Sequence, residues 1–221
     1  ILLVIAAHNF LWSQAGPGYK WVQSLGGENF GEFGLDCDID AADNIYMTGE
    51  FNDGAIFGND TLSTQGDNDL FLSKFAPYGN LLWTVPFGSG QLDRAYAVNV
   101  GGKVIFPSFT GSSSVHARDA LIARFDTSGG IIWGLNLDGD IFSEATDVVG
   151  NSIGECYLSG RMNTLSYIQG DTLDGNGKVD GMLLKWSPNG TYLWGRAIGG
   201  SEDDDLITVS AGDDHSVVAG G

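Results

Sequence analysis

An aspartate and a tryptophan recur 14 residues apart at three places in the chain. The pairs are Asp69 and Trp83, Asp119 and Trp133, and Asp180 and Trp194. With Trp21 included, successive tryptophans are separated by 62, 50 and 61 residues. A fixed period in this range is typical of repeat proteins, in which each unit buries its apolar surface against its neighbours. The chain is therefore predicted to fold as an array of similar units.

Each of the three windows between aspartate and tryptophan has the pattern of a β-hairpin. A basic residue stands five positions after the aspartate, and a glycine stands ten positions after it. The segments ending on that glycine are Ala76–Gly79, Asp126–Gly129 and Ser187–Gly190. Their Pro, Asn, Ser and Gly residues suit a type I turn. We expect a strand before each turn and a strand carrying the tryptophan after it.

The strand expected before each turn is apolar without alternation, as in Leu70-Phe71-Leu72 and Met182-Leu183-Leu184. Continuous apolar character predicts a strand covered on both faces. Radially stacked sheets provide such cover, since each blade of a β-propeller packs between two others. We predict an all-β fold, a β-propeller of four-stranded antiparallel blades, with about three and a half blades present. The expected units are 21–83, 83–133, 133–194 and a partial 194–221.

The motif at 69–83, Asp-x-Phe-Leu-x-Lys-Phe followed by Gly79 and Leu82-Trp83, with Asn44–Gly49 before it, resembles the bacterial seven-bladed β-propeller repeat. The resemblance covers about residues 19–221. Its weakest match is the second repeat, where Phe106-Pro107-Ser108 replaces a strand ending in glycine. The resemblance implies a secreted or surface-attached bacterial protein. Such proteins often carry adhesion-type domains and a C-terminal sorting domain, and the family has no common catalytic residues.

The first 15 residues are predicted to be a truncated secretory signal peptide. The run Ile1–Ala7 is apolar, and Ser13 and Ala15 fit the small-residue pattern of a cleavage site. A buried first strand is the alternative. A membrane-spanning helix would need about 20 mainly apolar residues, so no membrane insertion is expected after cleavage. We expect the chain to be a fragment at both ends, with the repeats in residues 16–221.

The acidic composition narrows the possible partners. The chain has 28 acidic and 10 basic residues, and its net charge is −18. A nucleic-acid backbone would be repelled by such a surface. An acidic surface keeps an extracellular protein soluble, and divalent-cation binding by Asp-rich loops is the alternative.

Several motifs resemble catalytic or metal sites but have simpler interpretations. Gly150–Gly154 matches G-x-S-x-G, yet a strand follows it where a nucleophile elbow needs a helix, so we expect a turn. His8, His116 and His215 lack metal-ligand spacing. Asp174–Asp180 resembles a calcium loop, but Lys178 occupies a would-be ligand position. A turn capped by the Asp180 side chain explains that loop better.

The remaining candidates are acidic runs, tryptophans and cysteines. The runs Asp36–Asp40 and Glu202–Asp205 are expected to be solvated edges, with cation sites as the alternative. The tryptophans are expected to pack between blades, with a sugar-stacking platform as the alternative. Cys37 and Cys156 are expected to be small buried residues, and a disulfide between them stays open. No residue is assigned as catalytic, cofactor-binding or metal-binding.

These observations predict a non-catalytic extracellular scaffold or interaction module, secreted or at the cell surface. Its partner would be an extracellular protein or glycan, bound by loops that vary between repeats. No cofactor is expected, although calcium is possible. Two alternatives stay open: the propeller portion of a secreted enzyme acting on polysaccharide, and a calcium-stabilised adhesin.

Overall fold

The chain is described by a computed structural model covering residues 2–8, 18–26, 32–88, 93–101, 104–114, 117–139, 143–163 and 165–221. The described residues form strands and turns and contain no helix, which agrees with the predicted all-β class. None of them therefore forms a helix that could cross a membrane.

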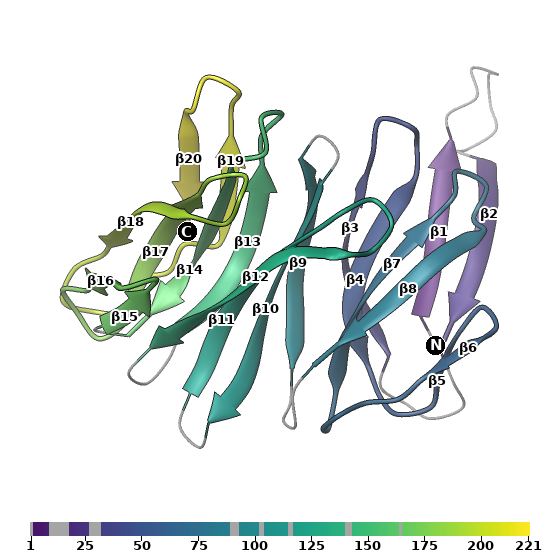
Figure 1. Ribbon diagram of the computed structural model, residues 1–221, viewed down its shortest axis with the longest axis horizontal. Helices are drawn as coiled ribbons and strands as arrows, with labels where there is room; N and C mark the ends of the chain where they lie inside the picture. Colours follow the sequence, from purple (N-terminus) through teal and green to yellow (C-terminus); the bar gives the residue numbers. More distant parts are fainter. Residues whose placement is uncertain are drawn as a thin grey trace.

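Three antiparallel sheets lie side by side in sequence order (Figure 1). The first sheet has the order β3 (Phe33–Ile39), β4 (Ile45–Phe51), β7 (Asp69–Phe75) and β8 (Leu81–Phe87). The second contains β9 (Arg94–Gly101), β10 (Val104–Ser114), β11 (Ala117–Phe125) and β12 (Ile131–Gly139). The third contains β13 (Ser143–Gly150), β14 (Cys156–Met162), β17 (Asp180–Trp186) and β18 (Tyr192–Ile198). Each contains four antiparallel strands in sequence order, as the repeat pattern predicted.

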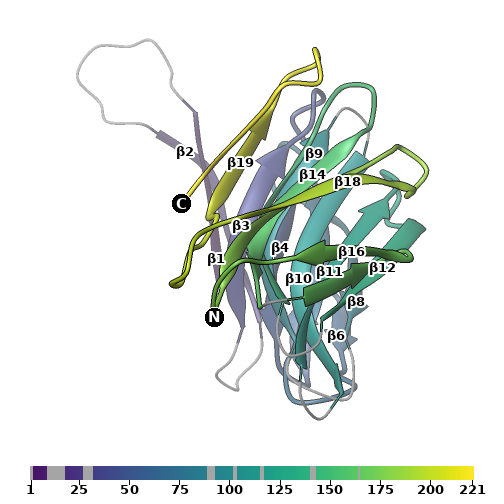
Figure 2. The same ribbon diagram turned by 90° about the vertical axis from the view of Figure 1, so that its left-hand side faces the viewer.

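Four two-stranded β-hairpins make up the remaining strands of the described chain. At the two ends lie β1 (Leu2–His8) with β2 (Gly18–Leu25), and β19 (Thr208–Ala211) with β20 (Val217–Gly220). Two insertion hairpins lie within repeats, β5 (Ala55–Phe57) with β6 (Asp60–Leu62), and β15 (Leu165–Ile168) with β16 (Asp171–Asp174). The second insertion hairpin pairs with β12, so the second sheet has six strands rather than the expected four (Figure 2).

The predicted signal peptide is only partly described. Its apolar run forms β1, which pairs antiparallel with β2 from Leu2 opposite Leu25 to His8 opposite Gly18. Residues 9–17, which include the expected cleavage site at Ser13 and Ala15, lie outside the described residues, as does His116. The signal peptide stays a prediction, because cleavage is a processing event of the chain.

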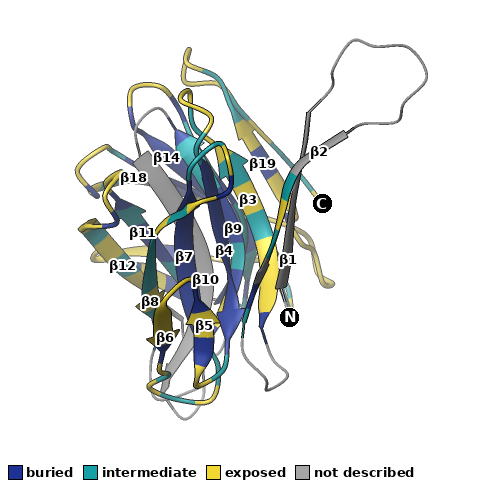
Figure 3. Cartoon of the chain, turned by 90° about the vertical axis from the view of Figure 1, so that its right-hand side faces the viewer, coloured by how far each residue is buried: buried dark blue, intermediate teal, exposed yellow. Residues whose placement is uncertain are grey.

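The middle strands of the sheets are covered on both faces. Every residue of β4, β7 and β17 is buried, whereas the outer strands β8 and β18 are only partly buried. Figure 3 shows this contrast, with β4 and β7 buried and β3 largely exposed at one end of the array. The uninterrupted apolar runs at 70–72 and 182–184 therefore correctly predicted two-sided burial.

The three predicted type I turns are confirmed. The N–H of Gly79 bonds to the carbonyl of Ala76 at 2.9 Å, and equivalent bonds close the turns at Gly129 and Gly190. These three glycines have φ of +88°, +88° and +81°. A left-handed residue after a type I turn is a common hairpin connection, and glycine adopts it without a steric penalty.

Three of the tryptophans on outer strands are bonded to a turn of the next sheet. We call this contact the tryptophan staple. In every case the indole N–H donates to the carbonyl of the second turn residue. The pairs are Trp21 with Pro77 at 3.1 Å, Trp83 with Thr127 at 3.2 Å and Trp133 with Pro188 at 3.2 Å. The interpretation of these tryptophans as inter-sheet packing is thereby confirmed.

The inner strands β3, β9, β13 and β19 contact one another in that order (Figures 1 and 2). Their open edges are capped by side chains of the preceding strand. Asp36 and Asp38 accept from the N–H groups of Val98 at 2.8 Å and Val100 at 2.7 Å. Asp147 accepts in the same way from Val209 at 2.9 Å. The expectation that Asp36 and Asp38 form a solvated edge is therefore wrong, because their carboxylates satisfy the neighbouring backbone.

The repeat aspartate lies against a glycine near the end of the outer strand. A Cβ added to Gly88 would stand 2.2 Å from the Asp69 carboxyl, and one added to Gly199 would stand 2.1 Å from that of Asp180. This close approach explains why a glycine stands five residues after Trp83 and after Trp194. The sheets end at Phe87, Gly139 and Ile198, so each expected unit boundary falls within the outer strand, a few residues before the sheet ends.

The two cysteines occupy different environments. Cys156 is buried in β14, as expected, but Cys37 is exposed on β3, and both are free thiols. Cys37 shares its strand face with the exposed side chain of Ile39. The prediction that Cys37 is buried is wrong because β3 is the first of the contacting inner strands β3, β9, β13 and β19, and among the described strands no equivalent inner strand precedes it.

We predict that Gly190→Ala destabilises the chain by about 2–5 kcal/mol. The left-handed conformation costs an alanine about 1–2 kcal/mol, and overpacking adds about 1–3 kcal/mol, since the new Cβ would stand 2.8 Å from the Trp133 ring. Gly170→Ala is the matched control, because Gly170 has φ +87° but no atom within 4 Å of the Cβ that an alanine would add. Urea unfolding of both variants measures the difference, and equal losses would contradict the staple.

Candidate functional site

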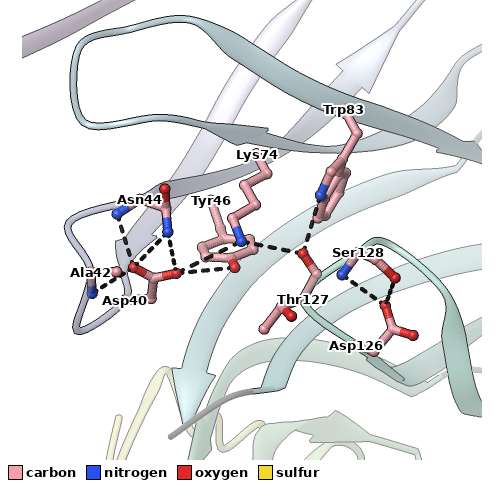
Figure 4. Close-up of polar contacts among 9 residues, drawn as sticks. All are labelled: Asp40, Ala42, Asn44, Tyr46, Lys74, Trp83, Asp126, Thr127 and Ser128. Carbon is pink, nitrogen blue, oxygen red and sulfur yellow. Dashed lines mark hydrogen bonds and ion pairs between the residues drawn. The ribbon is translucent and has the colours of Figure 1, made fainter.

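A buried lysine in the first sheet connects a turn, a tyrosine ring and the next sheet (Figure 4). The ammonium of Lys74 lies 3.8 Å from Asp40, 4.8 Å from the centre of the Tyr46 ring and 3.2 Å from the carbonyl of Thr127. That carbonyl also accepts the bond from Trp83. The lysine therefore reinforces the tryptophan staple between the first and second sheets.

Asp40 is held ionised within this cluster. Burial by itself would raise the pKa of its carboxyl, but hydrogen bonds from the side chain and backbone of Asn44 and from the Ala42 N–H outweigh it and lower the pKa. Burial and the adjacent Asp40 carboxylate raise the pKa of Tyr46. The tyrosine is thus a neutral donor, and the carboxylate and lysine form a partly dehydrated ion pair.

The third sheet contains the same cluster with the acid and the amide exchanged. Asn151 and Glu155 begin and end the turn where the first sheet has Asp40 and Asn44. Lys185 lies 2.9 Å from Glu155 and 4.9 Å from the centre of the Tyr157 ring. Because each polar group is bonded to another member, both clusters stabilise the fold rather than present a reactive group.

His215 belongs to the third-sheet cluster. It has φ +65° in the turn between β19 and β20, and its Nδ1 lies 2.8 Å from Glu155. On the same turn, Asp213 accepts from the N–H of Ser152 at 2.9 Å. His215 thus joins the last hairpin to the third sheet, in a role that its turn-like sequence context did not reveal.

The motifs that resembled catalytic or metal sites are parts of turns. Residues 151–155 connect β13 to β14, and the N–H of Gly154 bonds to the carbonyl of Asn151 at 2.9 Å, so the G-x-S-x-G segment is the predicted turn. The Asp180 carboxylate accepts from the N–H groups of Asn176 at 2.8 Å and Gly177 at 3.0 Å, which confirms the predicted cap.

The acidic run at 202–205 forms ordinary ion pairs and turn bonds. Glu202 pairs with Lys178 at 2.6 Å, Asp204 accepts from the N–H of Gly200 at 2.7 Å, and Asp205 lies 3.5 Å from Arg161. These side chains are exposed, as expected for a solvated edge. Within the described ranges, no group of three or more His, Cys, Asp or Glu side chains is arranged to hold a metal ion.

An open polar groove of about 480 Å³ lies where the first insertion hairpin meets the turn and outer strand of the first sheet. Its lining comes from β2, the β5–β6 hairpin and residues 79–83. The lining residues are Gln23, Phe57, Gly58, Asn59, Asp60, Gly79, Asn80, Leu81, Leu82 and Trp83. Three side-chain amides and one carboxylate supply polar groups, and Leu82 is 51% exposed. A concave surface with amide and carboxylate groups beside an exposed leucine is a candidate binding site. We call it the Gly58 groove.

The sequence analysis missed this groove. Its signal is one of the differences between two matching segments. Asp60-Thr61-Leu62 and Asp171-Thr172-Leu173 align, but Gly58 stands where the third repeat has Gln169. Whether that difference opens a space depends on the position of the hairpin against β8, which the sequence does not give.

Comparison with known proteins supports the fold alone. No family model and no curated protein matches the chain. A solved structure, that of a protein of unknown function from Bacteroides caccae, is similar, with a TM-score of 0.51 and 10% sequence identity. The similarity covers 91% of this chain and 56% of that one, so the chain spans about half the length of its structural neighbour.

We predict that Glu155 makes stability depend on acid pH. Burial by itself would raise the pKa of Glu155, but bonds from Lys185, His215 and Asn151 lower it from 4.5 to about 2. A pKa below the unfolded value contributes stability above about pH 4.5, and this contribution of about 3 kcal/mol is lost as the pH falls from about 4.5 towards 2. Chemical unfolding at several pH values should therefore show a flatter dependence in Glu155→Gln.

Glu202→Gln is the matched control for this measurement. Its carboxylate also pairs with a lysine at 2.6 Å, but the Glu202 side chain is 76% exposed. Exposed pairs contribute little, so this variant should follow the unmodified chain across the same pH range. A Glu155→Gln variant with an unchanged pH dependence would contradict the assignment.

Proposed function

We propose that the chain is a non-catalytic extracellular interaction module built of β-propeller repeats of the seven-bladed bacterial type, secreted or held at the cell surface. The observation that carries this proposal is the tryptophan staple, which joins three consecutive pairs of repeats in one register. A contact repeated in register makes each unit a neighbour of the next, as radially packed blades require.

Two end features support a longer array than the described sheets. Strand β3 carries the exposed side chains of Phe33, Leu35 and Ile39, which are 56%, 47% and 57% exposed. At the other end, the indole N–H of Trp194 has no acceptor within the described part of the chain, although three equivalent tryptophans have one. An interior repeat would present both features to a neighbour.

The Gly58 groove is the proposed binding surface. It lies on an insertion hairpin outside the repeated strands, where repeats can differ without disturbing the core. With a net charge of −18, the chain would favour neutral or basic partners over polyanions. We therefore expect an extracellular protein or a neutral glycan as the partner.

Binding without turnover is the expected result of a screen. The full chain would be tested by biolayer interferometry against immobilised extracellular proteins and neutral polysaccharides, and each polysaccharide would be assayed for new reducing ends. We expect saturable binding to at least one partner and no reducing ends. Release of reducing ends would instead favour a polysaccharide-acting enzyme, and no saturable binding would contradict the proposal.

A calcium-stabilised adhesin is the second candidate. Asp69 and Asp180 are 2% and 0% exposed, and the Oδ1 atom of each has no hydrogen-bond partner. An orphaned buried carboxylate oxygen is costly, and a calcium ion would satisfy it. The interaction-module proposal predicts the same melting temperature in calcium and in EDTA. A melting temperature that is higher in calcium than in EDTA, with the difference lost in Asp69→Asn and Asp180→Asn, would favour the adhesin.

A further inference from the structure

The two insertion hairpins have equivalent strand pairing. Each residue of the second lies 111 positions after its counterpart in the first. Phe57 and Ile168 are 0% and 1% exposed, Ile56 and Tyr167 are 46% and 47%, and Leu62 and Leu173 are both 8%. Their partners are also equivalent, because the Ile56 carbonyl accepts from the N–H of Gly26, just after β2, and Tyr167 pairs with Asp138 of β12. The two sites can therefore be compared directly.

In the third repeat, a glutamine fills the space next to the turn. The side-chain nitrogen of Gln169 donates to the carbonyl of Gly190 at 2.8 Å, and its oxygen accepts from the N–H of Tyr192 at 2.7 Å. One primary carboxamide thus satisfies a carbonyl and an N–H that are two residues apart. The chain itself shows which chemical group this arrangement binds.

In the first repeat, the glutamine is replaced by glycine in the same left-handed conformation, although the residue after it is left-handed only in the third repeat, at Gly170. Gly58 has φ +63° and Gln169 has φ +49°, so both positions are left-handed. The backbone groups equivalent to those bound by Gln169 belong to Gly79 and Leu81, and both residues line the Gly58 groove. The groove is therefore the same site without its carboxamide.

We propose that the Gly58 groove binds a primary carboxamide, the asparagine or glutamine side chain of a partner polypeptide. Its N–H would donate to the Gly79 carbonyl and its oxygen would accept from the Leu81 N–H. This inference rests on the proposed function as an interaction module, and it names the group that the module recognises.

The geometry favours an amide side chain over an N-acetyl sugar. A primary amide presents its oxygen and one hydrogen on the same side, which suits a carbonyl and an N–H close together on one strand. The acetamido group of a sugar is a trans secondary amide, whose oxygen and hydrogen point in opposite directions. The remaining lining, with the amides of Gln23, Asn59 and Asn80 beside Leu82, suits the backbone and side chains of a polypeptide.

The first experiment titrates the ¹⁵N-labelled full chain with N-acetylglutamine methylamide and follows amide shifts by NMR. N-acetylglutamate methylamide has nearly the same shape but carries a carboxylate, and N-acetylglucosamine tests the sugar. We expect a saturable shift of the Leu81 amide with the glutamine compound alone. No shift with it, an equal shift with the glutamate compound, or a shift with the sugar alone would overturn the proposal.

Two substitutions transfer the site between repeats. Gly58→Gln should fill the groove as Gln169 does and weaken binding at least tenfold. Gly54→Gln is the matched control, because Gly54 lies in the same hairpin with φ +84° and no atom within 4 Å of an added Cβ. This control should bind normally. Conversely, Gln169→Gly should create a second site, seen as a new shift of the Tyr192 amide. Normal binding by Gly58→Gln would overturn the proposal.

The same variants separate this inference from the function on which it rests. If a partner found in the binding screen is retained by Gly58→Gln, the carboxamide site is wrong while the interaction module stands. If the glutamine compound binds the groove but no macromolecule binds the chain, the carboxamide site stands and the proposed function fails.

Discussion

A single hydrogen bond, from a tryptophan indole to a turn carbonyl of the next sheet, organises the array. The turn must offer a carbonyl at its second position and a glycine at its fourth, because the ring lies against that glycine. The Trp133 ring, for example, would stand 2.8 Å from a Cβ on Gly190. The outer strand must also hold the ring at a fixed distance from the turn of its own hairpin. These requirements link the spacing within each repeat to the packing between repeats.

The acidic residues of the chain do more than keep it soluble. Asp36 and Asp147 cap the open edges of the next inner strands, and Asp40 and Glu155 hold buried lysines. Open strand edges invite pairing with other chains, so caps from a neighbouring strand protect each sheet while joining it to the next. These carboxylates therefore help to hold neighbouring sheets together. A net charge of −18 is thus compatible with a packed array.

Differences between the repeats are confined to places that the staple does not constrain. The turns keep the glycine at their fourth position, whereas the insertion hairpins differ at several positions, among them Gly58 and Gln169. In one repeat the side chain closes the site with its own amide, and in the other the same backbone groups line an open groove. A repeat architecture can thus acquire a binding site by losing one side chain, since the neighbouring repeats maintain the backbone.

The sequence by itself determined the all-β class, the hairpins, the type I turns and the two-sided burial of the middle strands. These follow from local periodicity and turn chemistry, which act over a few residues. Only the tertiary structure decided whether Cys37 is buried, which group Asp36 binds and whether the Gly58 groove exists. Whether Cys37 is buried depends on a sheet beside β3, and Asp36 meets a backbone N–H that is 62 residues away in the chain. Contacts between sheets join residues that no local pattern connects, so their partners are fixed only when the sheets pack.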